Sequence, residues 1–404
     1  MKNATRAVIG GRRSAKEART VNPPLTRAST IVFPTYADLQ AANRTRSGDG
    51  LTYGLHGVQS TYELEEALCA IEIGDRDPAG YRTRLTQTGL MAVTMPMLAI
   101  LSPGDHCLLP DSVYGETRNF ARRTLSRLKV EVEYYDPLIG GEIAVLMRET
   151  TRLILVESPG SWTFEMQDIP AIAAAAHAGG ALVMMDNTWA TPLYFNAFDH
   201  GVDISMQALT KYVGGHADLL FGSVTASEEV YSRYLQPFWR DLGAGVSPDD
   251  AWLALRGLRS MPTRLSHHHA AGVRVGAWLM TRAEVAEVIH PAMPHDPGHA
   301  LWQRDFTGAG SLFAFVLPED RSSDAHVAAL VDDLALFSMG FSWGGYESLI
   351  LPTNPQAART ATTWPRPGRP GGRVMRLYIG LEDPEDLIAD LAAGLDRLAA
   401  LPPS

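Results

Sequence analysis

Lys211 is one of only four lysines in a chain that otherwise carries its positive charge on arginine, and no lysine follows it. A guanidinium stays protonated at any working pH, whereas a desolvated ε-ammonium can lose its proton and attack a carbonyl carbon. Lys211 lies between the apolar segment DISMQAL and the pair Gly214 and Gly215. This context favours a reactive amine, with a solvated surface lysine as the alternative.

Other polar groups lie at the ends of nearby apolar runs. The run ALVMM ends at Asp186, the run ISMQAL ends at Thr210 and Lys211, and TQTGLMAV places Gly89 at the start of an apolar helix. Ligands of open α/β sheets bind beyond the carboxyl ends of the strands, and helix N-termini bind phosphate. An amine, a carboxylate and a phosphate site together indicate pyridoxal 5′-phosphate, whose aldehyde, ring nitrogen and phosphate need these groups. Asp186 could instead cap the following turn.

The elements that must position these groups form an alternating pattern. Short apolar runs alternate with segments of helical periodicity, which predicts crossover units on a mostly parallel sheet with helices on both faces. The predicted strands are DHCLLPD, VEVEYYD, TRLILVESP, ALVMMDN and VDISMQALT, and the predicted helices are STYELEEALCAIE, YGETRNFARRTLSRL and IPAIAAAAHAGG.

The pattern divides the chain into three parts. Residues 1–57 have little periodicity and are predicted to form an extended arm, residues 58–253 a cofactor-binding α/β domain, and residues 254–404 a smaller α+β domain. The last part contains one long helical pattern from about residue 250, two strand-like runs and a closing helix. Its stretch 353–372 is rich in Pro, Gly and Thr and predicts a mobile surface loop.

Composition excludes several classes of protein. A net charge of −10 without a long basic run argues against nucleic acid or an anionic membrane as the partner, so we expect a small-molecule substrate. Two cysteines cannot form a disulfide framework, and neither a signal peptide nor a spanning segment is evident, which favours the cytoplasm. The histidines of SHHHA at 266–270 are adjacent on a predicted helix and point in different directions, so we expect no metal site there.

Six segments resemble the pyridoxal-phosphate-dependent enzymes of cysteine and methionine metabolism, over nearly the whole chain. They are VESPGS at 156–161, DNTWA at 186–190, TKYVGGHAD at 210–218, RDFTGAGSLFAFVL at 304–317, FSWGGYESL at 341–349 and RLYIGLED at 376–383. The resemblance implies the type I fold of the aspartate aminotransferase kind, with a mostly parallel central sheet and a smaller C-terminal α+β domain. It also implies a homotetramer whose active sites are shared across a dimer interface.

The resemblance also implies roles for residues around the cofactor. Lys211 would bind the cofactor aldehyde and act as the base, Asp186 would pair with the ring nitrogen, and Tyr114 would stack on the ring and take part in catalysis. The remaining cofactor contacts are the phosphate ligands implied by the family, namely the backbone N–H groups of Gly89 and Leu90, the hydroxyl of Thr210, and Tyr53 from a neighbouring subunit.

On the substrate side, the resemblance makes Arg376 the ligand of the α-carboxylate, a role that suits its planar fork. The alternative for Arg376 is a structural arginine at a strand edge. Ser342, Trp343 and Tyr53 would complete the substrate site. Trp343, together with the absence of glutamate at Phe341, favours β-elimination over γ-elimination.

The expected activity is therefore that of a carbon–sulfur β-lyase acting on cystathionine or a similar cysteine S-conjugate.

Three positions depart from the pattern of the family. Leu55 stands where an arginine commonly binds the phosphate, Ala208 where many relatives have serine, and Phe341 where β-acting relatives have tyrosine. A specialised lyase of a biosynthetic pathway, a γ-acting enzyme and a regulator without turnover stay open as alternatives.

Overall fold

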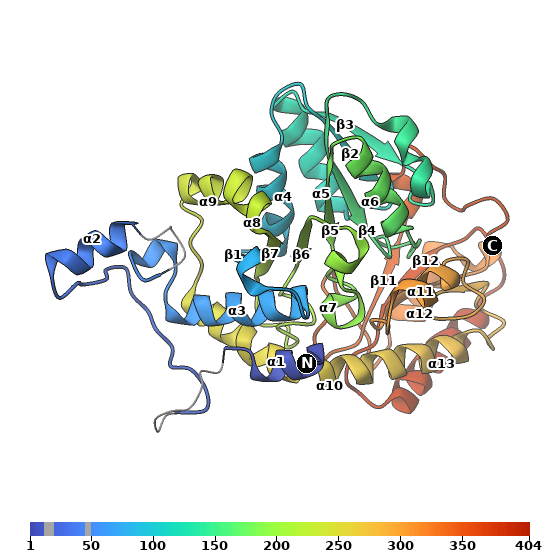
Figure 1. The fold of residues 1–404 in the computed structure, drawn as a ribbon. Helices are drawn as coiled ribbons and strands as arrows, with labels where there is room; N and C mark the ends of the chain where they lie inside the picture. The colour runs from blue at the N-terminus through green and yellow to red at the C-terminus, as the bar shows by residue number, and fades with distance from the viewer. Residues whose placement is uncertain (12–19, 45–49) are drawn as a thin grey trace.

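The computed structural model describes residues 1–11, 20–44 and 50–404, and it contains two sheets (Figure 1). The larger sheet has seven strands in the order β1-β7-β6-β5-β4-β2-β3, and every strand except β7 runs in the same direction. Its strands are β1 (Tyr81–Thr86), β2 (His106–Pro110), β3 (Glu131–Tyr135), β4 (Thr151–Glu157), β5 (Leu182–Asp186), β6 (Ile204–Gln207) and β7 (Gly222–Ser227). The predicted mostly parallel α/β sheet is confirmed.

Helices cover both faces of this sheet, as Figure 1 shows. Alternate residues of β4 face opposite ways: Leu153 and Leu155 belong to one apolar core, and Ile154 and Val156 belong to the other. The first core is closed by α4 (Gly89–Ile100) and neighbouring helices, and the second by α3 (Gln59–Ile73), α6 (Ile169–Ala178) and part of α10 (Pro248–Leu279). The shorter helices are α5 (Gly115–Phe120), α7 (Thr191–Tyr194), α8 (Glu228–Val230) and α9 (Gln236–Leu242).

The second sheet has five strands in the order β10-β11-β12-β9-β8, antiparallel except for the pair β10 and β11. The end of α10 packs on it together with α12 (Asp324–Val331) and α13 (Pro384–Ala399). The remaining elements are β8 (Glu287–Ile289), α11 (His299–Asp305), β9 (Leu312–Val316), β10 (Ser338–Met339), β11 (Leu349–Thr353) and β12 (Val374–Tyr378).

The N-terminal segment is only partly extended. Residues Asn3–Ile9 form α1, which packs with its Ala7 buried, so this part of the predicted arm is a docked helix. By contrast, α2 (Tyr36–Arg44) has no buried residue and lies away from the body of the protein in Figure 1. Positions 12–19 and 45–49 of the predicted arm lie outside the described residues. The predicted limit after residue 253 falls inside α10, and the three-part division of the chain stays a prediction.

The predicted surface loop at 353–372 is irregular and mostly exposed or half-buried, but its central part is anchored. Trp364 and Arg359 are buried, and the carboxylate of Asp111 accepts backbone N–H groups from Thr360 and Thr362 at 2.8–3.2 Å. Burial alone would raise the pKa of Asp111, but hydrogen bonds from Thr362, Thr360 and Arg118 outweigh it and hold this pKa at about 2. The segment is irregular, as its Pro and Gly content predicts, yet buried carboxylates fix it to the larger sheet.

None of the helices within the described ranges is long and apolar enough to cross a membrane.

Candidate active site

Lys211 follows β6 at the carboxyl edge of the larger sheet. Its Nζ donates a hydrogen bond to Ser342 Oγ at 2.9 Å and lies 5.1 Å from the centroid of the Trp343 ring. Burial lowers the pKa of Lys211 to about 8; the charge of Arg376 lowers it further, while Asp186 opposes the shift. More of this amine is therefore neutral near pH 7 than for a solvated lysine.

Asp186 ends β5 and pairs in register with Glu157 at the end of β4. Its Oδ1 accepts the backbone N–H of Thr188 at 3.0 Å, and burial raises its pKa. Burial, followed by the neighbouring Asp186, also raises the pKa of Glu157 well above its usual value. Sequence reasoning missed Glu157, although it closes the run TRLILVE just as Asp186 closes ALVMM.

Glu157 also connects this carboxyl pair to Tyr114. Its Oε2 accepts the backbone N–H of Tyr114 at 2.8 Å, just before α5 begins. The Tyr114 side chain is 46% exposed. Its pKa is raised by burial and then by the carboxylates of Glu116 and Asp186, so the phenol stays protonated at neutral pH. The structure thus places Tyr114 beside Asp186, with an exposed ring.

The beginning of α4 lies beside the segment that leads to Lys211. A Cβ added at Gly89 would be 2.4 Å from the Cβ of Ala208, so only glycine allows this approach. Thr88 caps the helix by accepting the N–H of Met91, and no acceptor for the N–H groups of Gly89 and Leu90 is found in the described parts of the chain. Two donors at a helix N-terminus are therefore available to an anion.

Thr210 lies next to this helix end, but its hydroxyl is already engaged. Its Oγ accepts the backbone N–H of Phe221 at 2.9 Å and donates to the carbonyl of Phe221 at 3.2 Å. A bond from Thr210 to an anion would require its hydroxyl proton to leave Phe221.

Arg376 lies in the middle of β12 and is 7% exposed. One amino group, Nη2, donates to the carbonyls of Gly340 at 3.0 Å, Phe341 at 3.1 Å and Ser342 at 3.3 Å. Burial lowers the pKa of Arg376 to about 10. No carboxylate of the described residues forms an ion pair with it, which leaves a buried cation near Lys211 for a ligand.

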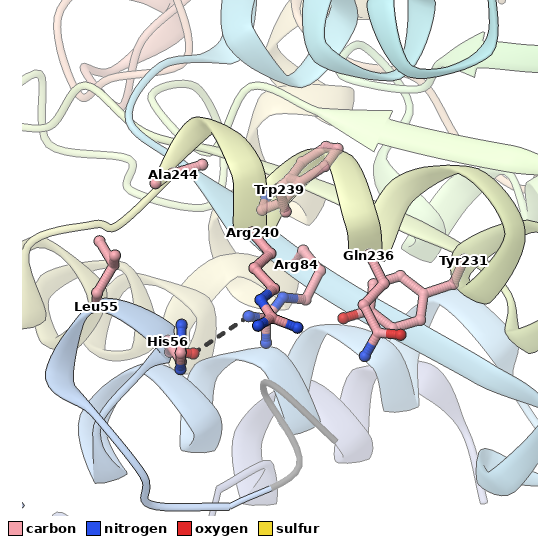
Figure 2. Close-up of a pocket in the computed structure, with 9 residues that line it drawn as sticks. Leu55, His56, Arg84, Tyr231, Gln236, Trp239, Arg240 and Ala244 are labelled. Carbon is pink, nitrogen blue, oxygen red and sulfur yellow. Dashed lines mark hydrogen bonds between the residues drawn. The ribbon is translucent and has the colours of Figure 1, made fainter. Parts of the chain in front are cut away.

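Within one chain, Tyr53 does not join the residues around Lys211. It is 50% exposed on the arm, and its ring contacts His56. A pocket close to Tyr53 in the sequence, shown in Figure 2, is separate from the residues around Lys211. Leu55 lies at one side of it, and Arg84 donates to the carbonyl of His56 at 3.2 Å. It is lined by Leu55, His56, Arg84, Tyr231, Gln236, Trp239, Arg240, Gly243 and Ala244.

Comparison with known proteins shows the family to which the chain belongs. The family model described as "Cys/Met metabolism PLP-dependent enzyme" matches residues 4–396. The chain belongs to this family. Pyridoxal 5′-phosphate is therefore its cofactor, as the sequence predicted.

Individual relatives agree with this assignment. Cystathionine β-lyase MetC of Escherichia coli is 38% identical, over 98% of both chains. A Rhizobium johnstonii protein provisionally named a cystathionine β-lyase is 48% identical, over 94% of this chain and 92% of its own. The crystal structure of cystathionine γ-synthase from Xanthomonas oryzae, in complex with aminoacrylate and cysteine, matches at 32% identity with a TM-score of 0.86, over 99% of both chains. The predicted type I fold is thus confirmed.

Proposed function

We propose that the protein is a carbon–sulfur β-lyase that cleaves cystathionine, or a closely related cysteine S-conjugate, to a thiol, pyruvate and ammonia. The observation that carries the proposal is a desolvated amine, Lys211, held close to Ser342, Trp343, Asp186 and Arg376. The relatives named as cystathionine β-lyases support the choice of substrate.

The donor groups present fit pyridoxal 5′-phosphate. Lys211 would bind its aldehyde, Asp186 its ring nitrogen, and the N–H groups of Gly89 and Leu90 its phosphate, with Thr210 as a further donor. Tyr114 would lie against the ring, because its exposed side chain is close enough to Asp186 for that carboxylate to add to the rise of its pKa caused by burial. When bound, the cofactor withdraws electrons from the substrate Cα and makes its hydrogen acidic.

The side chains of the site then act on the substrate. Arg376 binds the α-carboxylate through the guanidinium N–H groups that do not donate to the loop carbonyls, and this fixes the Cα relative to Lys211. Lys211 Nζ takes the Cα proton as a neutral amine, for which its lowered pKa prepares it. Ser342 Oγ accepts a hydrogen bond from the same nitrogen and holds it in place. The electron pair left at Cα expels the thiolate from Cβ.

Trp343 lies beside the amine that acts as the base. Its ring lies 5.1 Å from the Lys211 amine and packs against Tyr212. A large aromatic group at this distance favours the cationic state that Lys211 reaches after it takes the proton.

We further propose a homotetramer in the cytoplasm, with active sites shared across a dimer interface. The described part of the arm exposes large apolar side chains, Val21, Val32 and Tyr36, each at least 74% exposed. Covering this surface with a second copy would bury them, and Tyr53 and Leu55 would come with the arm. The two cysteines, Cys69 and Cys107, are free, which suits a reducing compartment.

The substitution Lys211→Arg tests the role of the amine. Arginine keeps the charge but cannot bind the aldehyde, so this variant should lose the visible absorbance of the bound cofactor and its lyase turnover while keeping its fold. Lys129→Arg is the matched control, because Lys129 is an exposed lysine in a turn. Turnover in Lys211→Arg would refute the assignment.

A further inference from the structure

A glycine turn lies directly against the backbone of Lys211. Gly344 has φ +90°, and a Cβ added to it would be 2.7 Å from the Lys211 Cα and carbonyl carbon. This turn immediately follows Ser342 and Trp343, the two residues that contact the amine. The position of the turn therefore determines whether both contacts exist.

The turn is held from behind by a fully buried tyrosine. Tyr378 Oη donates to the carbonyl of Gly345 at 2.7 Å. His268 of α10 lies behind this tyrosine, with Nε2 3.3 Å from Tyr378 Oη and Nδ1 3.0 Å from the carbonyl of Ile379. Ser311 Oγ donates to the same carbonyl at 2.5 Å. Tyr378, His268 and Ser311 are each 0% exposed, so these contacts do not compete with water.

The same part of α10 also holds the loop that follows Lys211. Arg264, one helical turn before His268, donates from Nη2 to the carbonyls of Val213 at 3.3 Å and Gly257 at 2.8 Å. The Tyr212 hydroxyl accepts the backbone N–H of Ser311 at 2.9 Å, and its ring lies 5.4 Å from that of Trp343. One helix thus fixes both the lysine loop and the loop that contacts the amine.

We propose that His268 and Tyr378 are positioning residues for the proton transfer, which hold the Gly344–Gly345 turn against Lys211 and so keep Ser342 and Trp343 on its amine. This inference rests on the proposed function of Lys211 as the base. Burial lowers the pKa of His268 to about 4, so its ring is neutral; it donates its one N–H, at Nδ1, to the carbonyl of Ile379 and packs against the ring of Tyr378, 5.6 Å between centroids. Tyr378 and His268 are each 0% exposed, so neither side chain lines the site.

The test compares two tyrosine-to-phenylalanine variants of the holoenzyme. Tyr378→Phe removes the hydroxyl that holds Gly345. Tyr135→Phe is the matched control, because Tyr135 is 1% exposed and its hydroxyl donates to the carbonyl of Leu155 at 2.8 Å, away from the glycine turn. The measurements are kcat and KM for cystathionine, with hydrogen or deuterium at the attacked Cα, and the fraction of folded protein.

We expect kcat of Tyr378→Phe to be about tenfold below that of Tyr135→Phe per folded molecule, since small misplacements of reacting groups are costly. KM should stay within about threefold, because Arg376 keeps its carbonyl contacts at Gly340 and Phe341. The deuterium effect on kcat should be at least as large as in the parent. Values of kcat within twofold of each other, a KM change that accounts for the loss, or a smaller deuterium effect would each overturn the inference.

A second variant keeps the inference testable if Tyr378→Phe does not fold. Gly344→Ala pushes the turn away from Lys211 from the opposite side and should give the same pattern of kcat, KM and deuterium effect. A parent-like kcat in Gly344→Ala would overturn the positioning role. Failure of the proposed function is distinguishable, because it would appear as turnover in Lys211→Arg, whatever the Tyr378 variant does.

Discussion

The substitution Arg376→Ala gives the most quantitative test of the substrate site. Truncating one partner of a buried charged hydrogen-bond pair costs about 2–5 kcal/mol. Arg376 is 7% exposed, but its Nη2 is already shared among three carbonyls at 3.0–3.3 Å. We therefore expect a loss of about 2–3 kcal/mol, or roughly 30-fold to 150-fold in kcat/KM, at 1.4 kcal/mol for each factor of ten.

The assay uses a pair of ligands that differ by one group. L-Alanine carries the α-carboxylate without a sulfur leaving group, and ethylamine lacks the carboxylate. The parent should bind L-alanine more tightly by the same factor that Arg376→Ala loses, whereas the variant should hardly distinguish the two. Arg397→Ala is the matched control, because Arg397 also donates to backbone carbonyls, those of Ala329 and Leu330, at a site in α13.

Two outcomes would refute this reasoning about Arg376. One is an unchanged preference for L-alanine in Arg376→Ala, which would make the arginine merely structural. The other is a loss of the cofactor absorbance in parallel with the loss of binding, which would place the effect at the cofactor instead.

Three further predictions concern Leu55, Asp111 and Lys211. Leu55→Arg should slow cofactor loss during dialysis against a competing amine, because a charged donor binds phosphate more strongly than a neutral one; loss as fast as in the parent would indicate that Arg240, in the same pocket, already supplies the charge. Asp111→Asn should lower the free energy of unfolding at pH 7 by about 3 kcal/mol. Folding depresses the pKa of Asp111 to about 2, so this stabilisation is present above pH ~4 and is lost as the pH falls through about 2. In urea unfolding, the difference in the free energy of unfolding between parent and variant should therefore shrink at that pH. A difference that does not change with pH would contradict the role of the Asp111 carboxylate in holding the loop. Finally, kcat should rise with pH to a plateau, with a midpoint near the pKa of Lys211, about 8, because only the neutral amine takes the proton. A pH-independent kcat between about pH 6 and 9 would contradict Lys211 as the base.

The strand ends explain why part of the site was predictable from sequence. Asp186 and Lys211 each follow an apolar run, and neighbouring parallel strands end at the same edge of the sheet, so their proximity follows from topology alone. The same rule would have found Glu157, which pairs with Asp186. The start of α4 at Gly89 was predictable because a capping threonine precedes an apolar run.

The rest of the site depends on contacts that sequence spacing does not carry. Ser342 meets Lys211 across 131 residues, and it does so because a glycine turn fits against the lysine backbone. The loop around Arg359 has the composition of a surface loop, and only the position of Asp111 and Glu165 shows why it is anchored. Strand β7, with the sequence GSVTAS, is short of large apolar residues and lacks a clear strand pattern.

The stoichiometry of products tests the central claim most directly. Purified protein with pyridoxal 5′-phosphate is incubated with cystathionine, and pyruvate, ammonia and homocysteine are measured together. We expect the three products in equal amounts, and none of them from Lys211→Arg. Release of cysteine with 2-oxobutyrate instead would show γ-elimination and would contradict the proposed β-lyase, as would the absence of pyruvate from both cystathionine and other cysteine S-conjugates.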